Sequence, residues 1–380
     1  MLALTNARVL TDEGFADDRV VLVDKGRIEA VLARGDLRAN GAAREDLAGA
    51  TLVPGFIDCQ VNGGGGVLFN DDPGVAAIRA IGAAHRRFGT TAFLPTLISE
   101  DFGVIDRAIR AVREAIEAGV PGVAGVHIEG PFINKARRGV HEAARIRELG
   151  ARDVALLSSL GKGRTLVTLA PEMTSPETLR QLAAKGVILS AGHTDGTFEE
   201  VSAAFKNGVR GVTHLFNAMS PLHHRQPGAV GAALADPDCW CGLIVDGHHV
   251  HPAVLKIALA SRRAERFMLV TDAMPAVGAA QDSFTLQGKR IRVENGMCVD
   301  DNGTLAGSAL DMAASVRNCV EMLHLPLERA VRMASTYPAQ FLGLDGEMGR
   351  IAPGYRANLV ALDARLDVSH TWIDGEAGRK

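Results

Sequence analysis

Residues 91–128 read TAFLPTLISEDFGVIDRAIRAVREAIEAGVPGVAGVHI, and they contain one complete unit of the fold that we predict. The runs Thr91–Leu97 and Gly122–Ile128 have the length and the apolar composition of buried strands. Between them, Val104–Ala118 has apolar residues at helical spacing. A strand, a helix and a second strand in this order indicate a β-α-β unit of an α/β protein.

The same alternation continues on both sides of this unit. Helix-start signals lie between the apolar runs, such as Ser175-Pro176 and the capping-box pattern Thr197-x-x-Glu200. We find eight strand-like runs, namely Leu52–Val61, Thr91–Leu97, Gly122–Ile128, Thr165–Ala170, Val187–Ala191, Gly211–Leu215, Cys241–Val245 and Phe267–Val270. Eight such units predict a (β/α)8 barrel of the TIM type, and an open doubly wound sheet is the alternative. We expect residues 275–303 to form a β-hairpin inserted between the last strand and its helix.

Both ends of the chain have a different residue pattern from the middle. Ala3–Leu10 alternates between apolar and polar residues, and a tight turn joins Val20–Val23 to Arg27–Leu32. Near the other end, Ala357–Asp363 and Val368–Asp374 also have the pattern of strands. We therefore predict that both chain ends pair in one small β-sandwich domain. This domain would comprise residues 1–50 and 346–380, and the barrel would comprise residues 51–345.

The composition excludes several classes of partner. A formal net charge of −3 offers no electrostatic reason for binding nucleic acid or an anionic membrane. No uninterrupted apolar stretch is long enough to span a bilayer, and Met1–Asp12 alternates like a strand rather than resembling a signal peptide. The five scattered cysteines suit a reducing compartment. We expect a cytoplasmic protein without nucleic-acid or membrane partners.

Polar residues of one kind end several of the predicted strands. The third run ends in Glu129, the fifth in His193 and the sixth in His214, while Asp246 and Asp272 follow the last two runs. In a (β/α)8 barrel these strand ends meet on one face, where active sites lie. One carboxylate and two imidazoles are a common ligand set of catalytic zinc sites. The coincidence of all three predicts a metal site, whereas any single histidine would be weak evidence.

The functional interpretation of Asp272 is a general base that activates water and later protonates a leaving amine. The alternative is a structural carboxylate bonded to the backbone. On the first strand, Asp58, Gln60 and Asn62 alternate and share one face. Three inward polar groups on an apolar strand require an explanation, and a nearby site would supply one.

Two further features suit an anion, but each has a simpler interpretation. The run Gly63–Gly66 could bring backbone amides near an anion, or it could be a plain tight loop. Arg225 lies in the loop 223–228 after the sixth run, where a guanidinium could hold a phosphate. A solvated arginine is the simpler explanation when the loop is considered alone.

These residues lie in motifs that resemble the N-acetylglucosamine-6-phosphate deacetylases, a family of the amidohydrolase superfamily. The resemblance extends through nearly the whole chain, and the number and order of the motifs make coincidence a poor explanation. The motifs are Pro54–Asp58 (PGFID), His127–Phe132 (HIEGPF), Ala191–Thr194 (AGHT), Thr213–Met219 (THLFNAM), Asp246–His249 (DGHH), Thr271–Ala273 (TDA), Leu305–Ser308 (LAGS), Gly349–Gly354 (GRIAPG) and Ala357–Val360 (ANLV).

The resemblance implies a role for each candidate residue. Glu129, His193 and His214 would hold the metal, and Asp272 would act as acid and base. His141 would contact the sugar or its acetamido group. The sugar phosphate would be surrounded by four residues, which are Asn217, Ala218, Arg225 and His249. In this family a neighbouring subunit completes the phosphate pocket, which implies a homodimer.

The resemblance also bears on the number of metal ions. Some members carry a His-x-His pair for a second metal on the first strand, where this chain has Gln60 and Asn62. These two amides are poor zinc ligands, so we expect one metal per subunit and treat them as the remnant of a second site. Zinc suits the ligands, although iron, cobalt or manganese could also bind them.

The implied activity is removal of the acetyl group from N-acetylglucosamine 6-phosphate, a small-molecule amino-sugar phosphate, in amino-sugar catabolism. The alternatives are the N-acetylgalactosamine epimer, a dihydroorotase or an N-acyl-amino-acid hydrolase. Dihydroorotase-like sites often use a lysine after the fourth strand, where this chain has Ala170-Pro171-Glu172. A noncatalytic sugar-phosphate sensor and a phosphate-binding isomerase rank lower, because neither requires the complete set of metal ligands and acid.

Overall fold

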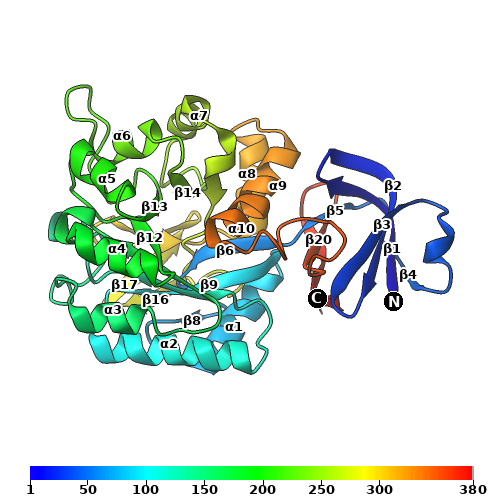
Figure 1. The fold of residues 1–380 in the computed structure, drawn as a ribbon, viewed down its shortest axis with the longest axis horizontal. Helices are drawn as coiled ribbons and strands as arrows, with labels where there is room; N and C mark the ends of the chain where they lie inside the picture. The colour runs from blue at the N-terminus through cyan, green and yellow to red at the C-terminus, as the bar shows by residue number, and fades with distance from the viewer. Residues whose placement is uncertain (379–380) are drawn as a thin grey trace.

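The structure, a computed structural model, describes residues 1–378 and contains two large sheets (Figure 1). The first is a barrel sheet of eight parallel strands, paired in the order in which they follow one another in the chain. These strands are β6 (Phe56–Val61), β9 (Thr90–Ile98), β10 (Gly125–Glu129), β11 (Arg164–Leu169), β12 (Ile188–Ala191), β13 (Val209–Val212), β14 (Trp240–Leu243) and β15 (Phe267–Leu269). Beyond β15, a parallel bridge between Val61 and Ala273 brings the last strand back to the first. This order confirms the predicted barrel and excludes the open doubly wound sheet.

Helices cover the outside of the barrel, and most of them bury one apolar stripe against the strands. In α2, Ile105, Ile109 and Val112 are buried at helical spacing. The predicted capping box at the start of α5 is present, since Thr197 accepts from the Glu200 amide and Glu200 accepts from the Thr197 amide. The helices are α1 (Val75–Arg86), α2 (Phe102–Glu117), α3 (Ala151–Leu157), α4 (Pro176–Ala184), α5 (Phe198–Phe205), α6 (Gly228–Ala235), α7 (Pro252–Ser261), α8 (Met312–Glu321), α9 (Leu327–Ala334) and α10 (Thr336–Leu342). Within residues 1–378, no helix is both long and apolar enough to cross a membrane.

The second large sheet is built from both chain ends, as predicted, and Figure 1 shows it beside the barrel with the two termini. Strand β20 runs antiparallel to β5, which joins the C-terminal strands to the N-terminal ones. Trp372, Leu52 and Leu359 lie in its core. The strands are β1 (Leu2–Thr11), β2 (Gly14–Asp24), β3 (Arg27–Ala33), β4 (Ala43–Asp46), β5 (Thr51–Pro54), β20 (Leu359–Leu362), β21 (Val368–Ile373) and β22 (Glu376–Ala377).

The predicted strand Leu52–Val61 is divided between the two sheets. Its first part is β5 in the sheet of the chain ends, and its second part is β6 in the barrel. The break falls at Gly55, where a Cβ atom would lie only 2.0 Å from Oγ1 of Thr91. The apolar run did not reveal the change of sheet, because its residues are buried in both sheets.

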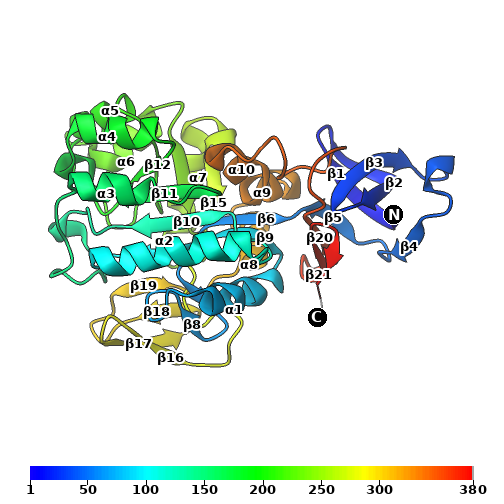
Figure 2. The same cartoon turned by 60° about the horizontal axis from the view of Figure 1, so that its bottom comes forward.

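The inserted segment is larger than the hairpin that we predicted. It forms a four-stranded antiparallel sheet of β16 (Ser283–Leu286), β17 (Lys289–Glu294), β18 (Met297–Val299) and β19 (Leu305–Ser308). Two turns, Gln287-Gly288 and Asn295-Gly296, have positive φ at both residues, as type I′ hairpins require. Figure 2 shows this sheet beside α1 and the short strand β8 (Val67–Leu68), which pairs with β7 (Gly63–Gly64). Leu305 and Gly307 of β19 line one cavity with Glu129 at the end of β10, so the inserted sheet reaches the mouth of the barrel.

Candidate metal centre and active-site cavity

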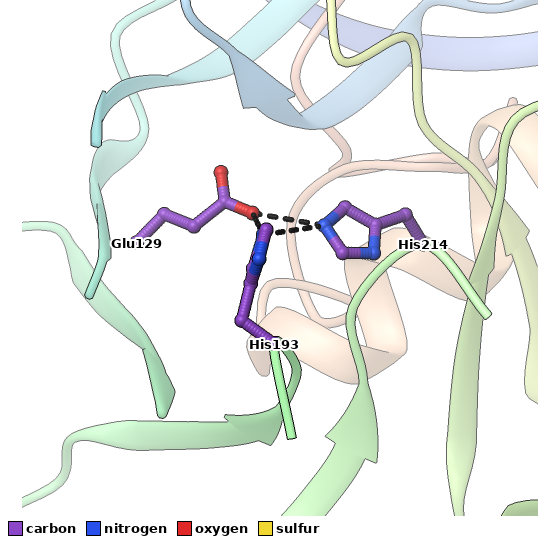
Figure 3. A group of neighbouring side chains, drawn as sticks. All are labelled: Glu129, His193 and His214. Carbon is purple, nitrogen blue, oxygen red and sulfur yellow. Dashed lines mark hydrogen bonds and ion pairs between the residues drawn. The ribbon is translucent and has the colours of Figure 1, made fainter. Parts of the chain in front are cut away.

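Three residues converge at the carboxyl ends of three barrel strands, and Figure 3 shows their side chains facing one another. Glu129 is the last residue of β10, while His193 and His214 each lie two residues beyond β12 and β13. The backbone φ angles of His193 and His214 are 48° and 35°, in the left-handed region that non-glycine residues seldom adopt. This conformation turns both imidazoles back towards the barrel interior, and such strained residues cluster at functional sites.

The three ligand atoms are spaced as one bound ion would require. Oε1 of Glu129 lies 3.1 Å from Nε2 of His193 and 3.0 Å from Nε2 of His214, and the two nitrogens are 3.2 Å apart. In a tetrahedral zinc site, bonds of about 2.0–2.1 Å place the ligand atoms ~3.3 Å from one another. All three side chains are buried.

The hydrogen bonds of His193 also fit a metal ligand. Its Nδ1 donates to the carbonyl oxygen of Arg137 at 2.9 Å, which leaves the lone pair of Nε2 free to coordinate. Burial opposes the ionisation of Glu129, but its close contacts with the rings of His193 and His214 hold the pKa of this carboxyl well below its usual range. A charged carboxylate beside two imidazole nitrogens fits a divalent cation.

Asp272 lies beside this group, at the end of the last barrel strand, and shares the left-handed backbone with a φ of 53°. Burial, and next the charge of Glu129, raises the pKa of Asp272 to about 6. Its Oδ1 accepts hydrogen bonds from Nε2 of Gln60 at 3.0 Å and Nδ2 of Asn62 at 2.6 Å. A carboxyl group with a pKa near neutrality can both accept and return a proton at working pH.

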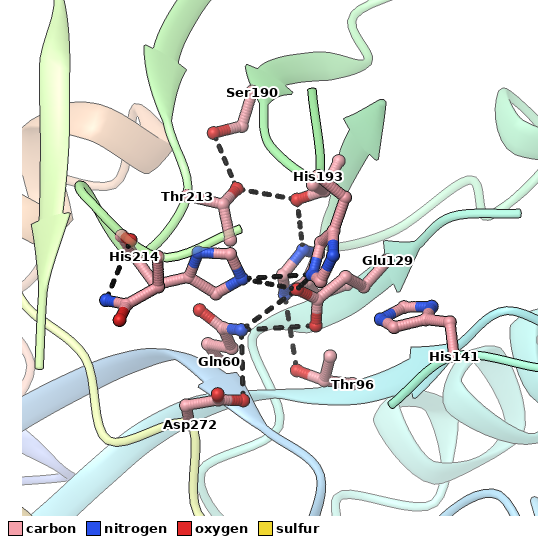
Figure 4. Close-up of polar contacts among 12 residues, drawn as sticks. Gln60, Thr96, Glu129, His141, Ser190, His193, Thr213, His214 and Asp272 are labelled. Carbon is pink, nitrogen blue, oxygen red and sulfur yellow. Dashed lines mark hydrogen bonds and ion pairs between the residues drawn. The ribbon is translucent and has the colours of Figure 1, made fainter. Parts of the chain in front are cut away.

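Of the two first-strand amides, Gln60 bridges the carboxylates, whereas Asn62 contacts only Asp272. Nε2 of Gln60 also donates to Oε2 of Glu129 at 3.1 Å, so one amide connects Glu129 and Asp272 (Figure 4). Asp58, which we expected on the same face, accepts instead from Oγ1 of Thr271 at 2.5 Å and from backbone amides. Burial raises its pKa to about 7. Gln60 and Asn62 thus supply N–H donors beside the carboxylates, whereas Asp58 ties β6 to the end of β15.

Most of the predicted site residues line one cavity of about 480 Å³. They are Glu129, His141, His193, His214, Asn217, Ala218, His249 and Asp272. Arg225 is not among them, since it lines a neighbouring pocket of about 470 Å³. Arg137 lines both pockets and pairs with Asp195 at 2.7 Å, so it lies between the cavity and the Arg225 loop.

The structure distinguishes the three histidines that follow β14. His248 is exposed, and His251 accepts the Ala253 amide at the start of α7. Only His249 of the three lines the cavity, and its Nδ1 lies 2.6 Å from Oδ2 of Asp246. Asp246 also accepts the backbone amides of His248 and His249, so it holds this turn and the His249 ring together.

His127, to which we assigned no role from the sequence, lies beneath the ligands. Nε2 of His127 is 2.8 Å from Oγ1 of Thr168, which is 2.6 Å from Oγ1 of Thr213. Thr213 in turn donates to Ser190 at 2.8 Å, so a chain of hydroxyls crosses the barrel interior (Figure 4). Burial lowers the pKa of His127 to about 4, which keeps the ring neutral. The signal was available, because His127 and Glu129 are two apart on one strand and face the same way.

A second feature that we missed is the apolar wall of the cavity. Ile98 ends β9, Met274 follows the last barrel strand, and Leu305 begins β19 of the inserted sheet. This wall contains no residue of a metal-ligand type. A search of the sequence for polar residues at strand ends therefore could not find it. It places apolar side chains beside the metal centre and the acid.

Similarity to known proteins shows the family of the chain. The model of the amidohydrolase family matches residues 51–378. The chain therefore belongs to the amidohydrolase family, as the motifs had implied.

Three relatives are similar over essentially their whole length. An N-acetylgalactosamine-6-phosphate deacetylase from Shewanella sp. (strain ANA-3) is 43% identical and covers 99% of this chain and 95% of its own. An N-acetylglucosamine-6-phosphate deacetylase from Haemophilus influenzae is 36% identical over 98% of both chains. The crystal structure of N-acetylglucosamine-6-phosphate deacetylase from Pasteurella multocida is 34% identical, covers 100% of both chains and superposes with a TM-score of 0.96.

The Asp246–His249 pair predicts a pH-dependent contribution to stability. Burial opposes ionisation of Asp246, but the hydrogen bond and charge of His249 lower its pKa to about 2, below the usual 3.8. The stabilisation is therefore present above about pH 4 and is lost as the pH falls towards about 2. We expect Asp246→Asn to lower the free energy of unfolding by about 2 kcal/mol near neutral pH and by much less near pH 2. Urea titrations of both proteins across this range measure the difference, and a pH-independent difference would contradict it.

Proposed function

We propose that this protein hydrolyses the acetamide of N-acetylglucosamine 6-phosphate to glucosamine 6-phosphate and acetate. The observation that carries the proposal is the convergence of Glu129, His193 and His214 with Asp272 in one cavity. This set contains the ligands of a hydrolytic metal centre and a carboxyl group suited to proton transfer. The full-length relatives named for this reaction support the choice of substrate.

The cofactor in this proposal is one divalent cation per subunit, zinc in the first instance, held by Glu129, His193 and His214. When bound, such a cation would polarise the acetamide carbonyl and lower the pKa of a neighbouring water molecule. Gln60 and Asn62 support a single ion, because their N–H groups point at the carboxylates that a second cation would have to bind.

The chain's own residues move the proton and orient the amide. Asp272 takes a proton from the attacking water and later delivers it to the leaving nitrogen, so that acetate and a free amine result. Gln60 and Asn62 hold one oxygen of Asp272 by hydrogen bonds. His141, which lines the same cavity, donates a hydrogen bond to the carbonyl oxygen as negative charge develops there.

Phosphate recognition is assigned to His249, Asn217, Ala218 and Arg225. The first three line the metal cavity, so they can hold the sugar phosphate beside the reacting amide. Binding energy from the phosphate then orients the bond that breaks. Arg225 is exposed and lines a separate pocket, which supports a role in the cavity of a second copy and hence a homodimer.

A second candidate substrate is the galactosamine epimer. The relative that is 43% identical is named as an N-acetylgalactosamine-6-phosphate deacetylase. Either substrate would place the reaction in the cytoplasm, because a sugar phosphate is charged and does not cross a bilayer unaided. The free state of all five cysteines supports the same reducing compartment.

The activity assay tests the proposal directly. Metal-loaded protein should release acetate from N-acetylglucosamine 6-phosphate and much less from the unphosphorylated sugar. Asp272→Asn should lower kcat by about 10²- to 10⁴-fold, the range that a general acid–base group contributes. The galactosamine epimer is assayed alongside, and the two kcat/KM values show which sugar phosphate is the better substrate. No acetate from any of these sugars, or wild-type turnover by Asp272→Asn, would reject the proposal.

Metal analysis tests the ligand assignment independently of turnover. We expect about one divalent ion per chain, as three converging ligands suggest. Glu129→Gln and His193→Ala should each weaken metal affinity by more than about 100-fold, since even a hydrogen-bond partner of a ligand contributes 10- to 100-fold. His248→Ala is the matched control, because this histidine is exposed and lies outside the cavity. Two ions per chain, or full occupancy in Glu129→Gln, would contradict the assignment.

Subunit complementation tests the placement of Arg225. Arg225→Ala should raise KM for the phosphorylated sugar by about 10-fold or more, because a hydrogen bond to a charged group is lost. Mixing Arg225→Ala chains with Asp272→Asn chains should restore about a quarter of the wild-type activity at low substrate, because half the dimers then hold one intact site. Each variant reassembled with itself is the control. If Arg225 serves its own cavity, mixing will restore nothing.

A further inference from the structure

The cavity histidine His141 is held by a single buried serine. Ser99 follows β9 directly and is fully buried. Its hydroxyl oxygen lies 2.6 Å from Nδ1 of His141, and its backbone N–H donates to the same Nδ1 at 3.3 Å. The ring of His141 is also packed 4.4 Å from the ring of His193, measured between centroids. Ser99 therefore contacts a ring that lies against the metal centre.

These contacts determine which nitrogen of His141 carries the proton. A backbone N–H can only donate a hydrogen bond, so Nδ1 must present its lone pair to Ser99. A neutral imidazole has one N–H, which then lies on Nε2. Within residues 1–378, Nε2 of His141 makes no hydrogen bond, and the ring lines the cavity (Figure 4). His141 thus offers the cavity a hydrogen-bond donor.

The inserted sheet holds this pair from the other side. Gln287 lies in the turn between β16 and β17, and its Nε2 donates to the carbonyl oxygen of Ser99 at 2.9 Å. Its Oε1 accepts the backbone N–H of Glu142, the residue after His141, at 2.7 Å. One side chain therefore connects the two segments that carry Ser99 and His141. The Ser99 hydroxyl is closely packed, because a Cβ on Gly130 would lie 2.3 Å from it.

We propose that Ser99 and Gln287 are positioning residues that keep His141 in the Nε2–H tautomer and aim this donor at the carbonyl oxygen of the substrate. The proposal rests on the hydrolase function proposed above and adds a task for the inserted sheet. A donor at Nε2 stabilises the oxyanion that forms during hydrolysis, whereas a lone pair there would repel it. Neither residue touches the substrate, so both act through His141.

Steady-state kinetics test the effect on turnover. Ser99→Ala, which removes the hydroxyl, and Gln287→Ala, which releases both segments, should each lower kcat on the order of 10-fold, with little change in KM or metal content. Ser99→Thr, which keeps a hydroxyl, should recover most of the loss. Arg290→Ala is the matched control in the inserted sheet. Arg290 is exposed, lies three residues after Gln287 and pairs with Thr285 on β16. This variant should retain the wild-type kcat.

Nitrogen-15 NMR of imidazole-labelled protein provides a readout that does not depend on turnover. The resonances of His141, assigned with His141→Gln, should show a protonated Nε2 and an unprotonated Nδ1 in the wild type and a mixture of tautomers in Ser99→Ala. If Ser99→Ala does not fold, Gln287→Ala serves the same comparison. A protonated Nδ1 in the wild type, or unchanged kcat and tautomer in both variants, would overturn the proposal. If the wild type hydrolyses no sugar amide while the tautomer shift occurs, the proposed substrate fails and the positioning role of Ser99 stands.

Discussion

A carboxylate and two imidazoles meet inside the barrel at 3.0–3.2 Å, and the rest of the site is arranged around this contact. Burying an ionised carboxylate is costly unless a cation or several donors compensate for the lost water. The barrel brings the three side chains together, because the ends of β10, β12 and β13 lie on one face. The left-handed backbone at His193 and His214 then turns the rings inward, so the fold bears local strain to keep the ligands together.

Neutral hydrogen-bond donors lie next to the carboxylates of this centre. Gln60 donates to both Glu129 and Asp272, so one amide offsets part of the repulsion between the two carboxylates. Beneath them, His127 takes part in a chain of hydroxyls from three different strands. Fixed dipoles of this kind need no rearrangement when charge develops during a reaction, which is the condition for effective electrostatic stabilisation.

The inserted sheet is the clearest case in which sequence reasoning was incomplete. Residues 275–303 showed an irregular pattern, from which we predicted one hairpin, and the structure has four strands that extend to Ser308. The Asn295-Gly296 turn was a readable signal for a second hairpin. What the sequence did not contain was the role of Gln287, because a solitary glutamine in a turn has no pattern that identifies its distant partners Ser99 and Glu142.

The alternation of apolar runs and amphipathic helices determined the barrel, and it placed Glu129, His193, His214 and Asp272 at strand ends. That inference succeeds without side-chain detail, because parallel strands of a barrel all end on the same face. The motif resemblance had already indicated His249 among the histidines after β14, whereas only the tertiary structure decided where Arg225 lies and which nitrogen of His141 donates. These properties depend on contacts between segments that are far apart in the chain, and local spacing carries no information about the geometry of such contacts.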